Sequence, residues 1–422
     1  MVMKKITFLS VLLIVFIFGA FKTYAQYDCV AGRFRDSIYP VQVKQNVLYG
    51  HNDNYDATPQ DLTMDIYTPV GDVHSKRPLI IFAPKGSFMS EDNKEWVMVQ
   101  LCTKLASMGY TTASINYRVG LNYFSTDLKA EFVKAVVRAV HDYKSAIRYF
   151  RKDAADSNKY KVDTNIMIAG GSSAGAITAI HAAYLKNAAQ VLPFMDTTGI
   201  AAQGGIEGLS GNQGFSSKVH YVVNLCGAIA DTAWIEAGMV PITSMHGDLD
   251  TEVPYAKGFP MGLSMINMQI YGSYNINLRA GHLGINNPFC IFPGQTHIPY
   301  DPNAGGDYKL YMDTVITFVK NQLHNFICGG ALNVSENIEN DNNISIYPNP
   351  ANSILNVKFD SEMKDFSLKI YDITGKEIYS ENGLNATASS VKKINTEGMA
   401  IGLYILKIQN SNAVKTVKFV VD

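Results

Sequence analysis

Apolar runs and apolar stripes alternate along the chain from residue 47 to residue 326. Short unbroken apolar runs predict buried parallel strands, whereas apolar residues spaced three and four apart predict amphipathic helices. Strands are predicted in this way at residues 78–83, 111–117, 165–169, 219–225, 241–245 and 288–292, with two more between 47 and 69; helices are predicted at 94–108, 128–156, 176–184 and 310–326. Such alternation indicates the α/β class, with a mainly parallel sheet covered by helices on both faces.

The pattern changes after residue 328. Residues 329–343 are polar, rich in asparagine and without period, which predicts a linker. From residue 344 to 422, short alternating segments follow, such as 355–359, 367–371, 403–408 and 414–420, with turn signals at 374–375 and 400–402. About seven short strands of this kind predict a small all-β sandwich. This stretch contains neither histidine nor cysteine, so we expect no catalysis there.

The N-terminus has the features of an export signal. Lys4 and Lys5 precede an apolar run at 6–21, and Thr23-Tyr24-Ala25 offers small residues for cleavage before Gln26. Residues 1–25 are therefore expected to be a signal peptide, with a retained membrane anchor as the alternative. The first folded domain then covers residues 26–328.

Composition and charge are those of an ordinary globular protein. The formal net charge is −1 and 47% of residues are hydrophobic, which gives no indication of a nucleic-acid partner. Five cysteines in an exported chain leave at least one unpaired. Cys29 and Cys328 stand at the two ends of the first domain and could form a disulfide. Cys102, Cys226 and Cys290 lie in apolar segments and are expected to be buried free thiols.

The candidate nucleophile is Ser173 in the segment Gly171-Ser-Ser-Ala-Gly175. A Gly-x-Ser-x-Gly motif between a strand and a helix is typical of a nucleophile elbow, where a tight turn exposes the serine hydroxyl above the sheet. Gly170 and Gly171 are expected to end the preceding strand. The alternative is a glycine-rich turn with an ordinary hydrogen-bonded serine.

A serine nucleophile needs a base and an acid, which in this arrangement follow it in the order Ser, Asp or Glu, His. His297 is the expected base, because it follows the last strand and a Pro-Gly turn. The other histidines lie in helices, in a strand, before the serine or beside the acid: His51, His74, His141, His181, His220, His246, His282 and His324. Asp250 is the expected acid, with Asp248 and Glu252 as alternatives, and His246 is expected to support its loop.

Backbone N–H groups must also stabilise the oxyanion that develops during acyl transfer. One is expected from Ala174, directly after the nucleophile. Others are expected from Gly86 and Ser87, in the loop that follows the strand at 78–83. The alternative for this loop is an ordinary strand-to-helix turn.

Residues 40–326 resemble the secreted carboxylesterase and lipase branch of the α/β-hydrolases. The resemblance is carried by segments 62–69, 86–88, 109–118, 170–175, 246–250 and 294–297. It implies an α/β-hydrolase fold and ester hydrolysis through an acyl-enzyme, with Ser173, Asp250 and His297 as the triad. One departure is that Pro84 and Lys85 replace the family's His-Gly. Loss of an oxyanion donor costs about 3 kcal/mol, although a cation here could also favour an acidic substrate.

The C-terminal segment has a resemblance of its own. Residues 346–351, the bend at 372–375, Gly402-Leu-Tyr404 and a last strand rich in lysine and valine resemble the type A sorting domain of the type IX secretion system. The resemblance implies export across the outer membrane, with the secretion machinery as partner and a secreted or cell-surface location. The alternative is a carbohydrate-binding or spacer sandwich.

These features favour a secreted serine esterase that acts on carboxylic esters of short acyl or aryl chains, free or linked to polysaccharide. We expect no cofactor, and the histidines and cysteines show no metal-ligand spacing. Activity should rise as the pH passes about 6 to 7, because the base must be neutral. One alternative is a lipase or peptidase, in which the glycine-rich loop at 199–217 is a lid or acyl-pocket wall. Another is a catalytically inactive surface-binding protein.

Overall fold

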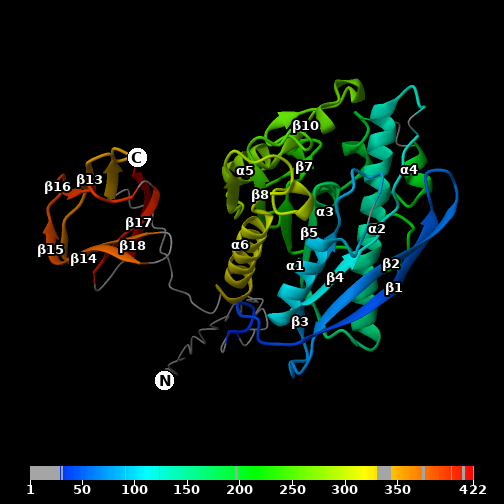
Figure 1. Ribbon diagram of the computed structural model, residues 1–422, viewed down its shortest axis with the longest axis horizontal. Coiled ribbons are helices and arrows are strands. Elements are labelled where there is room, and N and C mark those ends of the chain that lie inside the picture. The colour runs from blue at the N-terminus through cyan, green and yellow to red at the C-terminus, as the bar shows by residue number, and fades with distance from the viewer. Residues whose placement is uncertain are drawn as a thin grey trace, which may run out of the picture. The chain divides into compact units, whose positions relative to one another are not determined.

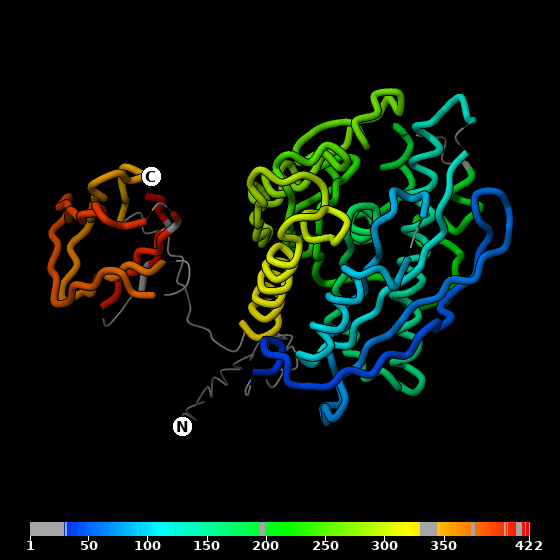
Figure 2. The backbone as a smooth tube through the Cα atoms, viewed as in Figure 1, coloured from blue at the N-terminus to red at the C-terminus, as the bar shows by residue number. Residues whose placement is uncertain are grey.

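The computed structural model describes residues 29, 32–90, 92–122, 124–194, 198–329, 344–372, 376–400, 402–410 and 414–421. The expected signal peptide, nearly all of the expected linker and the bend at 373–375 lie outside the described residues. Contacts within the chain define two compact units, divided between residues 331 and 332. Figure 2 shows the backbone of both, and each is described by itself below.

The first unit is built on an eight-stranded sheet (Figure 1) with the order β1-β2-β4-β3-β5-β6-β8-β11. The strands are β1 Val41–Asp53, β2 Pro59–Pro69, β3 Arg77–Ala83, β4 Thr111–Ile115, β5 Val162–Ser172, β6 Tyr221–Leu225, β8 Ile242–Gly247 and β11 Phe289–Phe292. The β1–β2 and β2–β4 pairs are antiparallel, and all other pairs are parallel. The mainly parallel sheet predicted from the sequence is therefore confirmed.

Helices cover both faces of this sheet, because its strands are apolar on both sides. In β3, Leu79 and Ile81 belong to one buried cluster and Ile80 and Phe82 to the other. The first cluster includes α2 (Leu128–Asp156), α3 (Ala174–Tyr184) and α5 (Ser273–His282), and the second includes α1 (Trp96–Ser107) and α6 (Tyr308–Cys328). Each helix thus buries its apolar stripe against the sheet.

Several short elements were not predicted. They are α4 (Thr198–Ala202), a small sheet of β7 (Ala228–Ile229), β10 (Ile270–Gly272) and β9 (Lys257–Gly258), and single turns at Ala188–Gln190, Thr232–Trp234, Pro260–Gly262, Ser264–Ile266 and Pro302–Ala304. Most of them lie in the segments between β6 and β8 and between β8 and α5. These segments are rich in glycine and proline and have no clear hydrophobic period, so the sequence pattern could not define them.

Several predicted strand boundaries were wrong, including the end of β5 and the start of β1. β5 does not end at Gly170 and Gly171, because both glycines pair with β3 on one side and β6 on the other. The strand at the start of the sheet begins at Val41 rather than at residue 47, because residues 41–44 pair with the end of β2.

The predicted pairing of Cys29 with Cys328 is confirmed as a disulfide, and it joins positions 299 residues apart. Cys102 and Cys226 are buried free thiols as expected, whereas Cys290 is only partly buried. Among the described residues, no helix is both long and apolar enough to cross a membrane.

In its described residues, the second unit has seven strands in two sheets, which confirms the predicted small all-β domain. One sheet has the order β12-β13-β16 and the other β15-β14-β17-β18. The strands are β12 Ile344–Tyr347, β13 Ile354–Phe359, β14 Met363–Asp372, β15 Glu377–Ala386, β16 Val391–Asn395, β17 Gly402–Gln409 and β18 Val414–Val421. Inward-facing residues of both sheets form one buried cluster that includes Leu355, Leu368 and Leu406.

Candidate active site

The carboxyl ends of four parallel strands of the sheet bring the expected site residues together. Ser173 follows β5, Asp250 follows β8, His297 follows β11, and the loop at 84–88 follows β3. These strands run parallel to one another, so the loops after them emerge at the same edge of the sheet. Ligand sites of open parallel sheets occur at this edge.

Ser173 lies at a strained turn between β5 and α3. Its backbone φ is +54°, a left-handed conformation that non-glycine residues rarely adopt. The turn requires small neighbours: a Cβ atom on Gly175 would lie 2.0 Å from the carbonyl oxygen of Ala83, and one on Gly171 would lie 2.3 Å from Gly175. The motif therefore has the geometry expected of a nucleophile elbow.

His297 links the serine to the acid. Its Nε2 lies 2.8 Å from Oγ of Ser173, and its Nδ1 lies 2.6 Å from Oδ2 of Asp250. A carboxylate only accepts hydrogen bonds, so Nδ1 carries the proton and Nε2 is left to accept the serine proton. This hydrogen-bonded chain has the arrangement that nucleophilic catalysis by serine requires.

Asp250 is held in place by further contacts. Its Oδ1 accepts the backbone N–H groups of Glu252 and Val253, both at 3.0 Å. His246, fully buried, donates from Nε2 to Oδ2 at 3.0 Å, which is the supporting position expected from the sequence. Burial by itself would raise the pKa of Asp250, but the hydrogen bonds from His246 and His297 hold it below its usual value.

The two alternative acids have other positions. Asp248 accepts the backbone N–H of Gly294 at 2.6 Å, and so fastens the acid loop to the histidine loop. The Glu252 side chain is 63% exposed, and its carboxylate approaches Nε2 of His297 only to 4.0 Å. The geometry therefore favours Asp250 over both.

Of the expected oxyanion donors, Ser87 and Ala174 line the cavity beside Ser173. Gly86 is not among the described residues that line it. Gly86 instead shapes the turn: its φ is +138°, and a Cβ atom there would lie 1.9 Å from the carbonyl oxygen of Ser90. A role of the Gly86 amide in oxyanion binding stays a prediction.

Lys85 is not a free cation beside this loop. Its ammonium forms an ion pair with Asp301, whose side chain is only 4% exposed. The suggestion that Lys85 favours an acidic substrate therefore lacks support, because its charge is already compensated. The pair joins the loop at 84–88 to the segment that follows His297. In the same segment, the Tyr300 hydroxyl lies 2.9 Å from the Ser172 hydroxyl, next to the nucleophile.

The walls of the cavity come from residues that the sequence analysis did not identify. Phe88, Phe132, Ile177 and Ile270 line it, together with Val253, Pro260 and Met261. Phe132 and Ile177 belong to the predicted apolar stripes of α2 and α3, but periodicity alone does not show that a stripe reaches a ligand site.

The loop at 199–217, expected as a lid or pocket wall, does not line this cavity. Instead Ser210 and Asn212 bond to α2 and β1.

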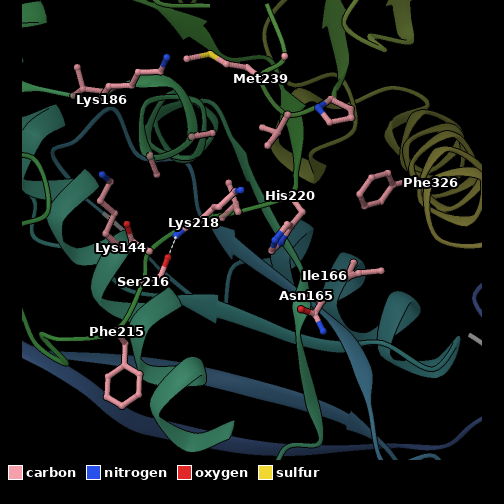
Figure 3. A pocket seen from close by; sticks show the side chains of 18 of the residues that line it. Lys144, Asn165, Ile166, Lys186, Phe215, Ser216, Lys218, His220, Met239 and Phe326 are labelled. Carbon is pink, nitrogen blue, oxygen red and sulfur yellow. Dashed lines mark hydrogen bonds between the residues drawn. The ribbon is translucent and has the colours of Figure 1, made fainter. Parts of the chain in front are cut away.

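A cavity of about 1250 Å³ lies at the opposite end of the strands, beside residues 165–166, 219–220 and 240–241 (Figure 3). Two of its lysines, Lys144 and Lys186, pair with glutamates. His220 directly precedes β6, rather than lying within a strand as expected, and its Nδ1 accepts the N–H of Met167 at 3.1 Å. Ser217, which also lines this cavity, donates a hydrogen bond from its hydroxyl to the Glu207 carboxylate. These partners leave no serine–histidine pair at this cavity among the described residues.

Cys226, His246 and Asp250 place three potential metal-ligand atoms within 4.8 Å of one another. Protein partners account for these positions. His246 Nδ1 lies 2.7 Å from the Ser273 hydroxyl, and its Nε2 bonds to Asp250. Burial raises the pKa of the Cys226 thiol to about 12, and the Tyr300 hydroxyl lies 3.6 Å from its sulfur.

The fold and the site geometry define the class of protein: an α/β-hydrolase joined to a C-terminal β-sandwich. Comparison with known families agrees with this class. Residues 64–231 match the BD-FAE family, and residues 345–422 match the family described as secretion system C-terminal sorting domain. The first unit is therefore an esterase-like α/β-hydrolase domain, and the second is a sorting domain of the type IX secretion system, which indicates a secreted or cell-surface protein.

Solved structures similar to this chain include esterase 2 of Thermogutta terrifontis in several states. The form phosphorylated by paraoxon is 21% identical, with a TM-score of 0.48, and the similarity covers 68% of this chain and 94% of that one. The propionate-bound form is 20% identical, with the same TM-score and coverage. No curated protein matches the chain.

Proposed function

We propose that this protein is a secreted serine esterase that hydrolyses carboxylic esters, with Ser173 as nucleophile, His297 as base and Asp250 as the orienting acid. The observation that carries the proposal is the continuous hydrogen-bonded chain from the Ser173 hydroxyl through His297 to Asp250. The buried, ionised Asp250 stabilises the imidazolium that forms when His297 accepts a proton.

The geometry supports a reaction in two halves. Ser173 Oγ attacks the ester carbonyl carbon while its proton moves to Nε2 of His297, and the resulting oxyanion accepts hydrogen bonds from the N–H groups of Ser87 and Ala174. The tetrahedral intermediate then collapses, and the alcohol leaves with the proton from His297. Water, deprotonated by His297, attacks the acyl-enzyme in the same way and releases the carboxylic acid.

The test compares wild type with Ser173→Ala on p-nitrophenyl acetate and butyrate. Loss of the nucleophile should lower kcat by at least about 10³-fold. Ser216→Ala is the matched control, since Ser216 is an exposed serine beside the opposite cavity. A fluorophosphonate probe should label wild type and the control at residue 173. Hydrolysis by Ser173→Ala at the wild-type rate would refute the proposal.

The inactive-protein alternative makes the opposite prediction for the same probe. Pro84 and Lys85 favour this alternative, but Ser87 and Ala174 still line the cavity at the nucleophile. Absence of labelling and of hydrolysis in folded wild type would favour that alternative. The lipase alternative predicts higher activity on emulsified triglyceride than on dissolved esters.

A further inference from the structure

A second cavity, whose lining residues are nearly all buried, adjoins the cavity at Ser173 in the first unit. The two cavities share Phe132, Ile177 and Ile270 as walls. We call the deeper one the inner slot; besides the shared walls it is lined by Val133, Val136, Val137, His181, Leu185, Val191, Phe194, Ala228, Ile229, Ala230, Trp234 and Met268. The shared walls place the inner slot next to the cavity that holds the nucleophile.

The inner slot offers no hydrogen bond from its one imidazole. His181 donates from Nδ1 to the carbonyl oxygen of Ile177 at 2.7 Å, and its Nε2 accepts the N–H of Ala230 at 3.3 Å. Burial lowers the pKa of His181 to about 4, so the ring is neutral. The other lining side chains are aliphatic, aromatic or methionine. A ligand that enters the slot must therefore be apolar.

The slot is also narrow. The cavity at Ser173 has a volume of about 20 Å³ and the inner slot about 30 Å³. A water-sized group needs roughly 10–15 Å³ of cavity volume, so the two cavities together hold about four groups of that size. A methylene is of similar size. A cavity that binds benzene is several times larger, at about 150 Å³.

The position of the slot relative to the serine decides which part of an ester would occupy it. Ile177 lies one helical turn after Ser173, and its N–H bonds to the Ser173 carbonyl oxygen. Because Ile177 lines both cavities, an acyl chain that extends past Ile177 leads toward the inner slot. The alcohol is left on the side of Glu252, whose side chain is largely exposed.

We propose that the inner slot is the acyl-binding site and that it selects short, unbranched aliphatic acyl groups of about four carbons. This inference rests on the proposed function. Each methylene that enters the slot should raise kcat/KM roughly fourfold. Aromatic acyl groups do not fit, and a phenolic hydroxyl would also be buried without a partner, which weakens binding by roughly ten- to a hundredfold.

The experiment uses the full chain and p-nitrophenyl esters of acetate, butyrate, octanoate, dodecanoate and benzoate. For wild type, kcat/KM should rise about fifteenfold from acetate to butyrate, as two methylenes are added, and fall for dodecanoate and benzoate. A wild type that hydrolyses none of these esters refutes the proposed function itself. A wild type that hydrolyses benzoate as well as butyrate, or shows no chain-length preference, refutes only the acyl slot.

Variants at Val136 test the location of the slot. Val136 lies one helical turn after Phe132 on α2 and lines the slot but not the cavity at Ser173. Val136→Phe should bring the ratio of butyrate to acetate kcat/KM close to one, and Val136→Ala should move the optimum to longer chains. Val43→Phe, at a position that is 41% exposed on β1, is the matched control.

Both Val136 substitutions disturb the packing, so a loss of stability would change the chain-length preference of both variants in the same direction. Opposite shifts in chain-length preference therefore cannot arise from loss of stability. If Val136→Phe does not fold, as judged by circular dichroism, Val136→Ala decides alone. A chain-length profile of Val136→Ala that coincides with that of wild type would overturn the proposal, and so would the same shift in Val43→Phe.

Discussion

The ion pair between Lys85 and Asp301 allows a quantitative prediction about the loop that departs from the family pattern. The Asp301 side chain is 4% exposed and the Lys85 side chain 24%. Lys85→Met leaves a nearly buried carboxylate without its partner, and breaking a buried pair in this way costs about 3–5 kcal/mol. Asp301→Asn leaves a more exposed ammonium and should cost less, about 1–3 kcal/mol. The two single variants should therefore destabilise unequally.

The double variant, with both Lys85→Met and Asp301→Asn, completes a double-mutant cycle. With both charges removed, neither is left unpaired, so its free energy of unfolding should lie above the value expected from adding the two single effects. Urea unfolding followed by tryptophan fluorescence is suitable, because both tryptophans of the chain, Trp96 and Trp234, belong to the first unit. The signal thus reports the hydrolase unit separately from the sorting domain.

Activity provides a second measurement of the same pair. Lys85 lies in the loop at 84–88, whose Ser87 is a proposed oxyanion donor, so Lys85→Met should lower kcat on p-nitrophenyl butyrate by about tenfold or more, with a smaller change in KM. Lys186→Met is the control, since Lys186 forms an exposed ion pair with Glu236, worth about 0–1 kcal/mol. If Lys85→Met matches the control in both stability and kcat, the pair does not position the loop.

Three further predictions concern other parts of the first unit. Asp250→Asn should lower kcat about 10³–10⁴-fold in steady-state assays, because an amide cannot stabilise the imidazolium; a loss below tenfold would exclude Asp250 as the acid. Burial raises the pKa of Glu95 from 4.5 to about 7, so its neutral form favours folding below pH 4.5 and this stability is lost as the pH rises through 7. Glu95→Gln should therefore be close to wild type at pH 5 and more stable at pH 8, by up to about 3 kcal/mol in urea unfolding; an equal difference at both pH values would contradict this. Cys29→Ser should lower the stability by about 3–5 kcal/mol, measured against Cys102→Ser, because the disulfide closes a long loop; equal melting temperatures of Cys29→Ser and wild type would contradict this.

The sequence alone was sufficient for the order of the main strands and helices and for the three residues that meet at the sheet edge. Ser173, Asp250 and His297 each stand a few residues after an apolar run, and local periodicity and turn residues locate such positions. Because parallel strands carry their following loops to one edge, the convergence of these side chains could be expected without coordinates. The all-β pattern of the C-terminal unit was recognisable for the same local reason.

The tertiary structure decided what depends on contacts between distant segments. The sequence shows a lysine at position 85, but its charge is compensated by Asp301, 216 residues further along the chain. It shows an apolar stripe on α2, but only packing against α3 and the segment after β8 turns Phe132 and Val136 into the walls of a cavity. It shows a glycine-rich loop at 199–217, which bonds to α2 and β1 and leaves the serine to other walls. Local patterns encode the elements, whereas the pairing of charges and the shape of cavities arise only when those elements pack together.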